Sequence, residues 1–151
     1  MSTNYFEQLS FEKKTVFIVE DNEVYSKLLQ TFLQSRFPDI ELKVFRIGEV
    51  CLMEMEMERN PTIVIVDYFL NSKYPEAQNG FEIIMRIKEL KPQTKIIVLS
   101  ALEDIALITE AIAKNEYSYI QKGDDAFKKV EQCINELLNQ TDQMKFEIGL
   151  Q

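Results

Sequence analysis

Acidic, hydroxyl and basic side chains stand at the ends of four apolar runs in this sequence. They are Glu20 with Asp21, then Asp67, Ser100 and Lys122. If these ends meet in the fold, carboxylates a few ångströms apart repel one another by roughly 4 kcal/mol per pair at an effective dielectric constant near 20. A Mg²⁺ ion relieves that repulsion, because it takes oxygen ligands and keeps positions open for water and phosphate. A carboxylate in such a pocket can also attack phosphorus and form an aspartyl phosphate.

The apolar runs predict strands that are buried on both faces. Val16–Val19, Ile63–Val66 and Ile96–Leu99 are uninterrupted apolar stretches, and Tyr117–Ile120 is a fourth candidate strand. Continuous runs of this kind are typical of parallel sheets. A fifth segment, 40–45, alternates between apolar and polar residues, as a half-exposed edge strand does. In open α/β sheets the functional crevice lies at the carboxyl ends of the strands, which is where the polar residues fall.

Helical patterns separate the strands. We expect one helix capped by Asp21 or Asn22, a long loop at 68–79, and further helices at about 48–59, 80–90, 103–114 and 124–139. The residues at helical spacing are Tyr25, Leu28, Leu29, Phe32 and Leu33 in the first helix, then Val50, Met53 and Met57 as core filler, then Phe81, Ile84, Met85 and Ile87 toward the core. Five strands alternating with five helices through right-handed crossovers predict an α/β fold, a doubly wound five-stranded parallel sheet with helices on both faces.

The bulk composition narrows the function. With 151 residues we expect one domain, at 14–140, between an N-terminal tail, 1–13, and a C-terminal tail, 141–151. The formal net charge of −8 opposes binding to phosphate backbones, so we expect no direct contact with nucleic acid. No run approaches the ~20 apolar residues of a membrane span, and no signal peptide is visible. Two cysteines without metal-ligand spacing fit a reducing cytoplasm, and the absence of histidine excludes imidazole chemistry within these residues.

Each polar residue also has a simpler interpretation. Glu20 and Asp21 could be only a helix cap, and Asp67 only a solvated strand end. Ser100 could cap the next helix, and Lys122 could be an ordinary surface lysine. Four of the five expected strands place a polar residue at the same edge of the sheet. This shared position favours a common site over four unrelated roles.

Taken in order, these segments resemble the receiver domain of bacterial two-component response regulators, from about residue 15 to residue 138. The segments that carry the resemblance are Val16–Asn22, Ile63–Asp67, Val98–Ala101 and Tyr117–Lys122. The resemblance implies the flavodoxin-like strand order 2-1-3-4-5 of the chemotaxis receiver. The loop after Asp67 is longer than is usual in that family, and Gly123 stands where a proline often follows the lysine.

The resemblance also implies a role for each polar residue, with Asp67 as the phosphoacceptor. The groups that would hold Mg²⁺ are the carboxylates of Glu20, Asp21 and Asp67 and the backbone carbonyl of Phe69. The residues that would contact the phosphate, or switch with it, are Ser100, Ala101, Lys122 and the aromatic Tyr119. Phe69 and Leu102 are both apolar and would influence how water reaches the acyl phosphate.

As such a receiver, the chain would take phosphate from a partner histidine kinase or phosphotransfer protein. It would then switch the face formed by its fourth helix, fifth strand and fifth helix, which would bind a partner or a second copy of the chain. It would be a phosphoacceptor with slow self-dephosphorylation and not an enzyme. Two alternatives stay open, an unphosphorylated scaffold with a receiver fold and a phosphatase of the haloacid-dehalogenase type. A scaffold has no need of the whole polar set, and the phosphatase would carry an aspartate where Phe69 stands.

Overall fold

The computed structural model describes residues 13–57, 59–70, 79–101 and 117–149, with 141–149 described by backbone alone. Its elements in chain order are β1 (Thr15–Val19), α2 (Glu23–Arg36), β2 (Glu41–Phe45), α3 (Gly48–Glu56), β3 (Ile63–Asp67), α4 (Gly80–Leu90), β4 (Lys95–Ser100), β5 (Ser118–Gln121) and α6 (Ala126–Gly149). The helix expected at 103–114, residue Leu102 and most of the loop expected at 68–79 lie outside the described residues.

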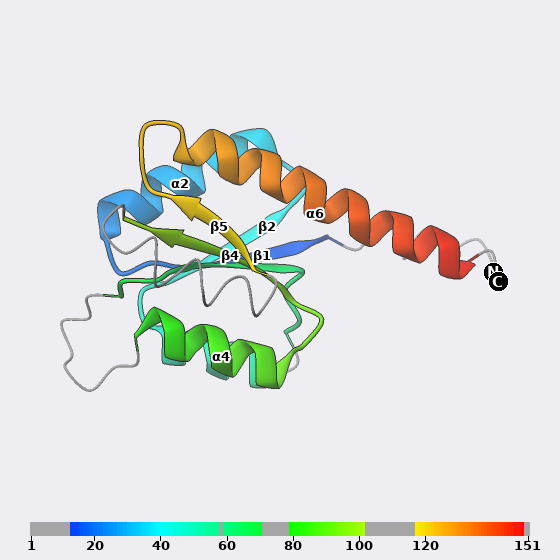
Figure 1. Ribbon diagram of the computed structural model, residues 1–151, viewed down its shortest axis with the longest axis horizontal. Helices are drawn as coiled ribbons and strands as arrows, with labels where there is room; N and C mark the ends of the chain where they lie inside the picture. Colours follow the sequence, from blue (N-terminus) through cyan, green and yellow to red (C-terminus); the bar gives the residue numbers. More distant parts are fainter. Residues whose placement is uncertain (1–12, 58, 71–78, 102–116, 150–151) are drawn as a thin grey trace.

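The five strands form one parallel sheet in the order β2-β1-β3-β4-β5. The predicted doubly wound sheet and its strand order are therefore confirmed. In Figure 1, α2 and α6 cover one face of the sheet and α4 lies on the other. α3 packs beside α4 and also contacts β1 and β2.

Alternate residues of the central strands point to opposite faces of the sheet. In β1, Phe17 and Val19 belong to the core on the side of α3 and α4, whereas Val16 and Ile18 belong to the core on the side of α2 and α6. β3 and β4 follow the same alternation, which is why their sequences are apolar almost throughout. Burial on both faces fixes the strand register, and with it the polar residues that lie side by side at the strand ends.

α3 turns a different face to the core from the one that its sequence indicates. Val50, Met53 and Met57 are 45%, 59% and 74% exposed, so the expected core stripe is wrong. The residues that α3 buries instead are Gly48, Cys51, Leu52 and Met55. Apolar residues lie on both sides of this short helix, so periodicity alone does not select a face. Close packing selects it, because a Cβ at Gly48 would collide with the side chain of Ile83 on α4.

Three other apolar positions expected on inward faces are also exposed. Phe81 and Met85 of α4 are 39% and 37% exposed, and Leu28 of α2 is 56% exposed. The residues that α4 buries are Gly80, Ile83, Ile84 and Ile87. The apolar arc of α4 is wider than the strip that the sheet covers, so compact isoleucines fill the strip and the longer side chains lie at its margins.

α6 continues to Gly149, so its expected end near residue 139 is wrong. Residues 140–148 contain neither glycine nor proline, and nothing in the sequence stops the helix before Gly149. In Figure 1, the last turns of α6 extend beyond the edge of the sheet. Among the described residues, no helix combines the length and the hydrophobicity that a membrane span requires.

Candidate phosphoacceptor site

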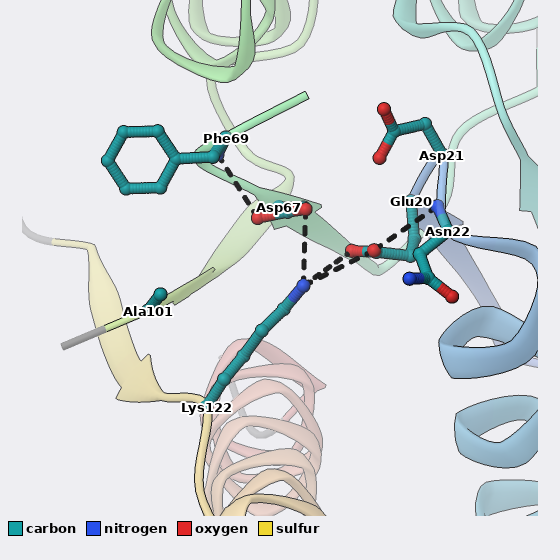
Figure 2. Close-up of a pocket in the computed structure, with 7 residues that line it drawn as sticks. All are labelled: Glu20, Asp21, Asn22, Asp67, Phe69, Ala101 and Lys122. Carbon is teal, nitrogen blue, oxygen red and sulfur yellow. Dashed lines mark hydrogen bonds and ion pairs between the residues drawn. The ribbon is translucent and has the colours of Figure 1, made fainter. Parts of the chain in front are cut away.

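Strand ends converge on a single pocket, shown in Figure 2. β1 and β3 run side by side with Val19 opposite Val66, so Glu20 and Asp67 follow at adjacent positions. Lys122 directly follows β5, and its side chain reaches the same pocket. The residues that line the pocket are Glu20, Asp21, Asn22, Asp67, Phe69, Ala101 and Lys122. Its volume of about 390 Å³ has room for a phosphoryl group with an ion and water, since a water takes about 30 Å³.

Asp67 is the last residue of β3, and both of its carboxylate oxygens accept hydrogen bonds. The backbone N–H of Phe69 donates to Oδ1 at 3.1 Å, and the Lys122 ammonium donates to Oδ2 at 3.2 Å. α4 begins directly against this strand end, because a Cβ at Gly80 would collide with the carbonyl oxygens of Asp67 and Tyr68. The carboxylate is therefore oriented by two donors on a strand end that backbone packing holds in place.

The ammonium group of Lys122 joins the two most buried acids of the pocket. Its Nζ lies 3.2 Å from both carboxylate oxygens of Glu20, in addition to its contact with Asp67. The Glu20 and Asp67 side chains are 1% and 5% exposed, and the Lys122 side chain is 22% exposed. Lys122 is thus a partly buried member of the site, and the interpretation of it as an ordinary surface lysine is wrong.

Three carboxylates crowd the pocket and repel one another. Glu20, Asp21 and Asp67 each offer an oxygen within 4.8 Å of the others. Burial, and then the charge of Asp67, raises the pKa of Glu20 to about 8 and raises the pKa of Asp21 above its ordinary value. Lys122 opposes both shifts without cancelling them. The pocket therefore disfavours full ionisation of its three acids, and a further cation would stabilise their ionised forms.

The donor set fits Mg²⁺. All three groups are carboxylates, the oxygen ligands that this ion prefers, and the pocket leaves space for waters and phosphate. Opposite ligands of an octahedral Mg²⁺ lie about 4.2 Å apart, since each metal–oxygen distance is about 2.1 Å. The three carboxylate oxygens lie within 4.8 Å of one another, so a single ion could be held among them.

The N-cap of α2 is Asn22 and not Asp21. The Asn22 side-chain oxygen accepts a hydrogen bond from the Tyr25 N–H at 2.9 Å, and the Asn22 N–H donates to Glu20 Oε1 at 3.4 Å. Asp21 takes no part in this cap, and its carboxylate lines the pocket. The interpretation of the acidic pair as nothing more than a helix cap is therefore wrong.

Ser100 and Tyr119, the expected switch residues, do not line the pocket. Ser100 is fully buried at the end of β4, and its hydroxyl donates to the carbonyl of Ala101 at 3.2 Å. Tyr119 lies opposite Val98 and packs against the core on the side of α3 and α4. Its hydroxyl is buried and has no hydrogen-bond partner within the described part of the chain. The Ser100 hydroxyl would have to turn to reach a phosphate, and both switch roles stay predictions.

Phe69 lines the pocket, but its ring points away from the acidic side chains. In Figure 2 the ring points away from Glu20 and Asp21, while its backbone N–H faces Asp67. The ring meets Tyr68 edge-on, with the centroids 5.1 Å apart. The Phe69 carbonyl as a metal ligand, and its side chain as a control on water, stay predictions.

Three residues contribute to the pocket without having been assigned to it from the sequence. Asn22 lines it, Gly80 sets the approach of α4, and Tyr25 lies against Lys122 with the ammonium 4.3 Å from the ring centroid. A glycine at the start of a predicted helix is a weak signal for close packing. By its spacing, Tyr25 resembles any other apolar residue of α2, so nothing in the sequence indicates its contact with Lys122.

The sequence of this chain is similar to a known family of protein domains and to two characterised regulatory proteins. Residues 16–135 match the family described as the response regulator receiver domain. The chain is 31% identical over 101 residues to the autoinducer 1 sensor kinase/phosphatase LuxN of Vibrio campbellii, covering 62% of this chain and 10% of LuxN. It is 22% identical over 126 residues to the photosynthetic apparatus regulatory protein RegA of Rhodobacter capsulatus, covering 83% of this chain and 64% of RegA. The chain thus spans only part of the length of either relative.

Solved structures support the fold. The receiver domain of the Francisella response regulator 1452 aligns with a TM-score of 0.65 and 19% identity, covering 85% of this chain and 99% of that domain. The response regulator DrrB of Thermotoga maritima aligns with a TM-score of 0.68 and 22% identity, covering 85% of this chain and 54% of DrrB. At these identities the likeness supports the five-stranded architecture alone.

Proposed function

We propose that this chain, which belongs to the response regulator receiver domain family, accepts a phosphoryl group on Asp67 and signals through a change in conformation. The observation that carries the proposal is the pair of hydrogen bonds on the Asp67 carboxylate. Phe69 N–H holds one oxygen and the Lys122 ammonium holds the other, beside a cavity with two further carboxylates. A nucleophile held in one orientation beside compensating charge is what phosphoryl transfer requires.

In the proposed reaction, a carboxylate oxygen of Asp67 attacks the phosphorus of a phosphohistidine. An O–P bond forms as the P–N bond breaks, and the electron pair of the broken bond stays on the imidazole nitrogen, which takes up a proton. The 151 residues contain no histidine, so the donor is a histidine kinase or phosphotransfer protein outside this sequence. Lys122 neutralises part of the charge that the phosphoryl group brings.

We propose that Glu20 and Asp21 hold Mg²⁺ together with Asp67, with the Phe69 carbonyl as a further ligand. When bound, Mg²⁺ supplies positive charge to the phosphoryl oxygens. The Glu20 oxygens that now contact Lys122 are the ones that an ion would require, so metal binding and the Lys122–Glu20 pair compete. Release of Lys122 from Glu20 would leave its ammonium available to the incoming phosphoryl group.

The proposed output is a change in surface. Ser100 and Tyr119 lie on β4 and β5, so movement of Ser100 toward a phosphate would be felt along β5 and α6. We propose that residues 103–114, β5 and α6 form the face that changes, and that it binds a partner protein or a second copy of the chain in the cytoplasm. Hydrogen exchange should change over residues 101–130 when beryllofluoride is added with Mg²⁺. A change confined to residues 67–80 would contradict this route.

The central experiment is to incubate the protein with acetyl phosphate and Mg²⁺ and to measure its intact mass. The parent protein should gain one phosphoryl group, and Asp67→Asn should gain none, since the amide keeps the shape but is not a nucleophile. Asp39→Asn is the matched control, because Asp39 is exposed and is not one of the residues that line the pocket. Full phosphorylation of Asp67→Asn would show that the acceptor has been assigned to the wrong residue.

A further inference from the structure

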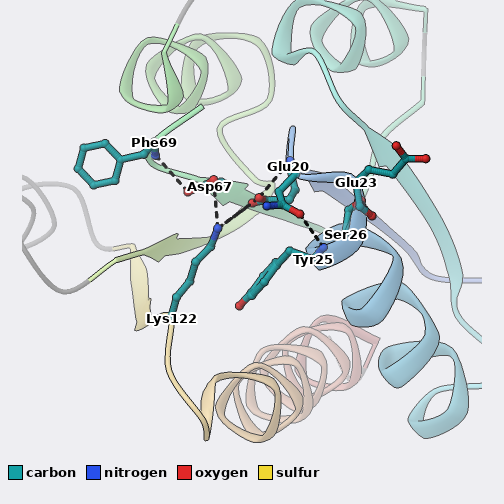
Figure 3. A network of polar contacts seen from close by, with 8 residues as sticks. Glu20, Glu23, Tyr25, Ser26, Asp67, Phe69 and Lys122 are labelled. Carbon is teal, nitrogen blue, oxygen red and sulfur yellow. Dashed lines mark hydrogen bonds and ion pairs between the residues drawn. The ribbon is translucent and has the colours of Figure 1, made fainter. Parts of the chain in front are cut away.

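Tyr25 contacts the ammonium group of Lys122 without a hydrogen bond. The Lys122 Nζ lies 4.3 Å from the centroid of the Tyr25 ring, within the roughly 6 Å over which a cation is attracted to an aromatic face. Figure 3 shows the carboxylates of Glu20 and Asp67 on one side of this ammonium and the Tyr25 ring on another. The cation is therefore held between two acids and an aromatic ring.

The Tyr25 ring is itself held from two helices. Its residue lies in the first turn of α2, where its N–H donates to the capping side chain of Asn22. Its ring meets Phe127 of α6 edge-on, at 5.5 Å between centroids and an interplanar angle of 72°. Phe127 in turn lies 5.5 Å from the ring of Phe32. The position of the ring against Lys122 is thus fixed by the packing of α2 against α6.

The hydroxyl of Tyr25 does not account for its place beside Lys122. The hydroxyl oxygen is buried and has no hydrogen-bond partner among the residues that the structure describes. Burial, followed by the charges of Glu20 and Asp67, raises the pKa of Tyr25 to about 12, so the side chain stays a neutral phenol at physiological pH. What Tyr25 offers Lys122 is the face of its ring.

We propose that Tyr25 is a positioning residue that keeps the Lys122 ammonium within reach of Asp67. This inference rests on the proposed role of Asp67 as the phosphoacceptor. Among the described residues, Glu20 now accepts two of the three hydrogen bonds that the Lys122 ammonium donates, and a metal ion would require the same oxygens. The flexible lysine would then keep one carboxylate partner, and the ring limits the positions that its ammonium can adopt. An aliphatic residue at position 25 fills space but offers no such attraction.

The first test compares Tyr25→Leu with Tyr25→Phe in the acetyl phosphate reaction at saturating Mg²⁺. Tyr25→Leu should slow phosphorylation of Asp67 by about threefold to thirtyfold, and Tyr25→Phe should restore most of the rate because it keeps the ring. The dissociation constant for Mg²⁺ should stay within about twofold of the parent value, since no ligand is changed. Tyr117→Leu is a matched control, because it removes another tyrosine–lysine contact, 4.5 Å to Lys88, away from the pocket lining.

A double-mutant cycle separates positioning from packing. In a Lys122→Met background, Tyr25→Leu should cause no further loss of rate, because the residue that it positions is gone. An equal loss in both backgrounds would overturn the proposal, as would a Tyr25→Phe variant that is as slow as Tyr25→Leu.

A readout that needs no phosphate keeps this inference separate from the proposed function. In a protein labelled with ¹³C at the lysine side chains, the Lys122 ε-methylene protons should be shifted upfield by the ring in the parent and in Tyr25→Phe. The shift should disappear in Tyr25→Leu. The same resonance position in all three proteins would overturn the positioning role, whereas a shifted resonance in a protein that takes up no phosphate would overturn the proposed function alone.

Discussion

The Lys122 ammonium lies 3.2 Å from both carboxylate oxygens of Glu20. The same nitrogen also contacts Asp67, so the lysine bridges the acid at the end of β1 and the acid at the end of β3. Both acids are almost fully buried, so their carboxylates depend on the few hydrogen bonds that they accept.

Removal of the bridging lysine should destabilise the protein and make it more responsive to metal. Lys122→Met leaves two buried acids without their shared donor, so we expect the free energy of unfolding to fall by about 1–3 kcal/mol. Mg²⁺ should then raise the melting temperature by more than it does in the parent, because the ion no longer competes with an ammonium group. Thermal melts with and without Mg²⁺ measure both effects, with Lys128→Met on the exposed side of α6 as the control. An identical Mg²⁺ shift in parent and variant would contradict the competition.

The pKa of Glu20 determines how the stability of the protein and its affinity for Mg²⁺ change with pH. Burial and then Asp67 raise this pKa from 4.5 to about 8 in the folded protein. Between those values the folded protein binds more protons at Glu20 than the unfolded chain does, so the contribution of Glu20 to stability falls as the pH rises through this window. Mg²⁺ requires the ionised form, and its affinity should therefore rise by about tenfold or more between about pH 6 and pH 8.5. Isothermal titration at several pH values tests this, and Glu20→Gln should flatten the profile.

Replacement of Asp21 should weaken the binding of Mg²⁺, whereas replacement of Glu23, the first residue of α2, should not. Asp21→Ala removes one of three clustered carboxylates, so we expect Mg²⁺ binding to weaken by about tenfold to a hundredfold and phosphorylation to slow with it. Glu23→Ala is the control, because Glu23 is exposed and pairs with Arg46 at 2.8 Å outside the pocket. Equal Mg²⁺ affinity in Asp21→Ala and the parent protein would remove Asp21 from the ligand set.

The fold and the meeting of the polar residues followed from the sequence because both depend on short local patterns. Runs such as Ile63–Val66 have to be buried on both faces, and parallel strands buried in this way end at one edge. The polar residue that follows each run is then brought to that edge whatever the details of packing are. This pattern alone predicts that Glu20, Asp67 and Lys122 lie together.

Features that depend on contacts between helices could not be predicted in this way. α3 has apolar residues on two sides, and the fit of Gly48 against Ile83 decides which side is buried. Tyr25 resembles a core residue by its spacing, yet its ring lies against a lysine that is distant in sequence. Neither contact leaves a periodic signal, because each joins two elements whose relative position is set only by the finished fold.

Gly80 should be required for the geometry of Asp67. A Cβ at this position would collide with the carbonyl oxygens of Asp67 and Tyr68, so Gly80→Ala has to displace either α4 or the end of β3. We expect a loss of about 1–3 kcal/mol in the free energy of unfolding, together with slower phosphorylation. Gly123→Ala is a matched control, since within the described part of the chain a Cβ there would meet only Asp125 Oδ1, at an ordinary 3.8 Å. Denaturant unfolding of both variants measures the difference, and equal stability would show that α4 can shift without cost.

The lifetime of the phosphoryl group should depend on the residue at position 69. Hydrolysis needs a water in line behind the phosphorus, and a polar side chain at the pocket wall can orient that water. Phe69 lines the pocket but has no polar atom in its side chain, and its ring is held edge-on against Tyr68. We therefore expect a long-lived phosphoryl group in the parent protein, and loss that is faster by about tenfold in Phe69→Asn, or about 1.4 kcal/mol in the barrier. Leu102→Glu, at a position outside the described residues, should act in the same direction.

The measurement is the half-life of the purified phosphoprotein with Mg²⁺ after the phosphodonor has been removed. Phe81→Asn is the matched control, because Phe81 faces Tyr68 at 6.5 Å and does not line the pocket. A short half-life in Phe69→Asn with a long one in Phe81→Asn would locate the effect at the pocket wall, where a water can be oriented. If the parent loses phosphate as fast as Phe69→Asn does, the apolar side chain does not limit the approach of water, and a different part of the pocket controls the lifetime of the signal.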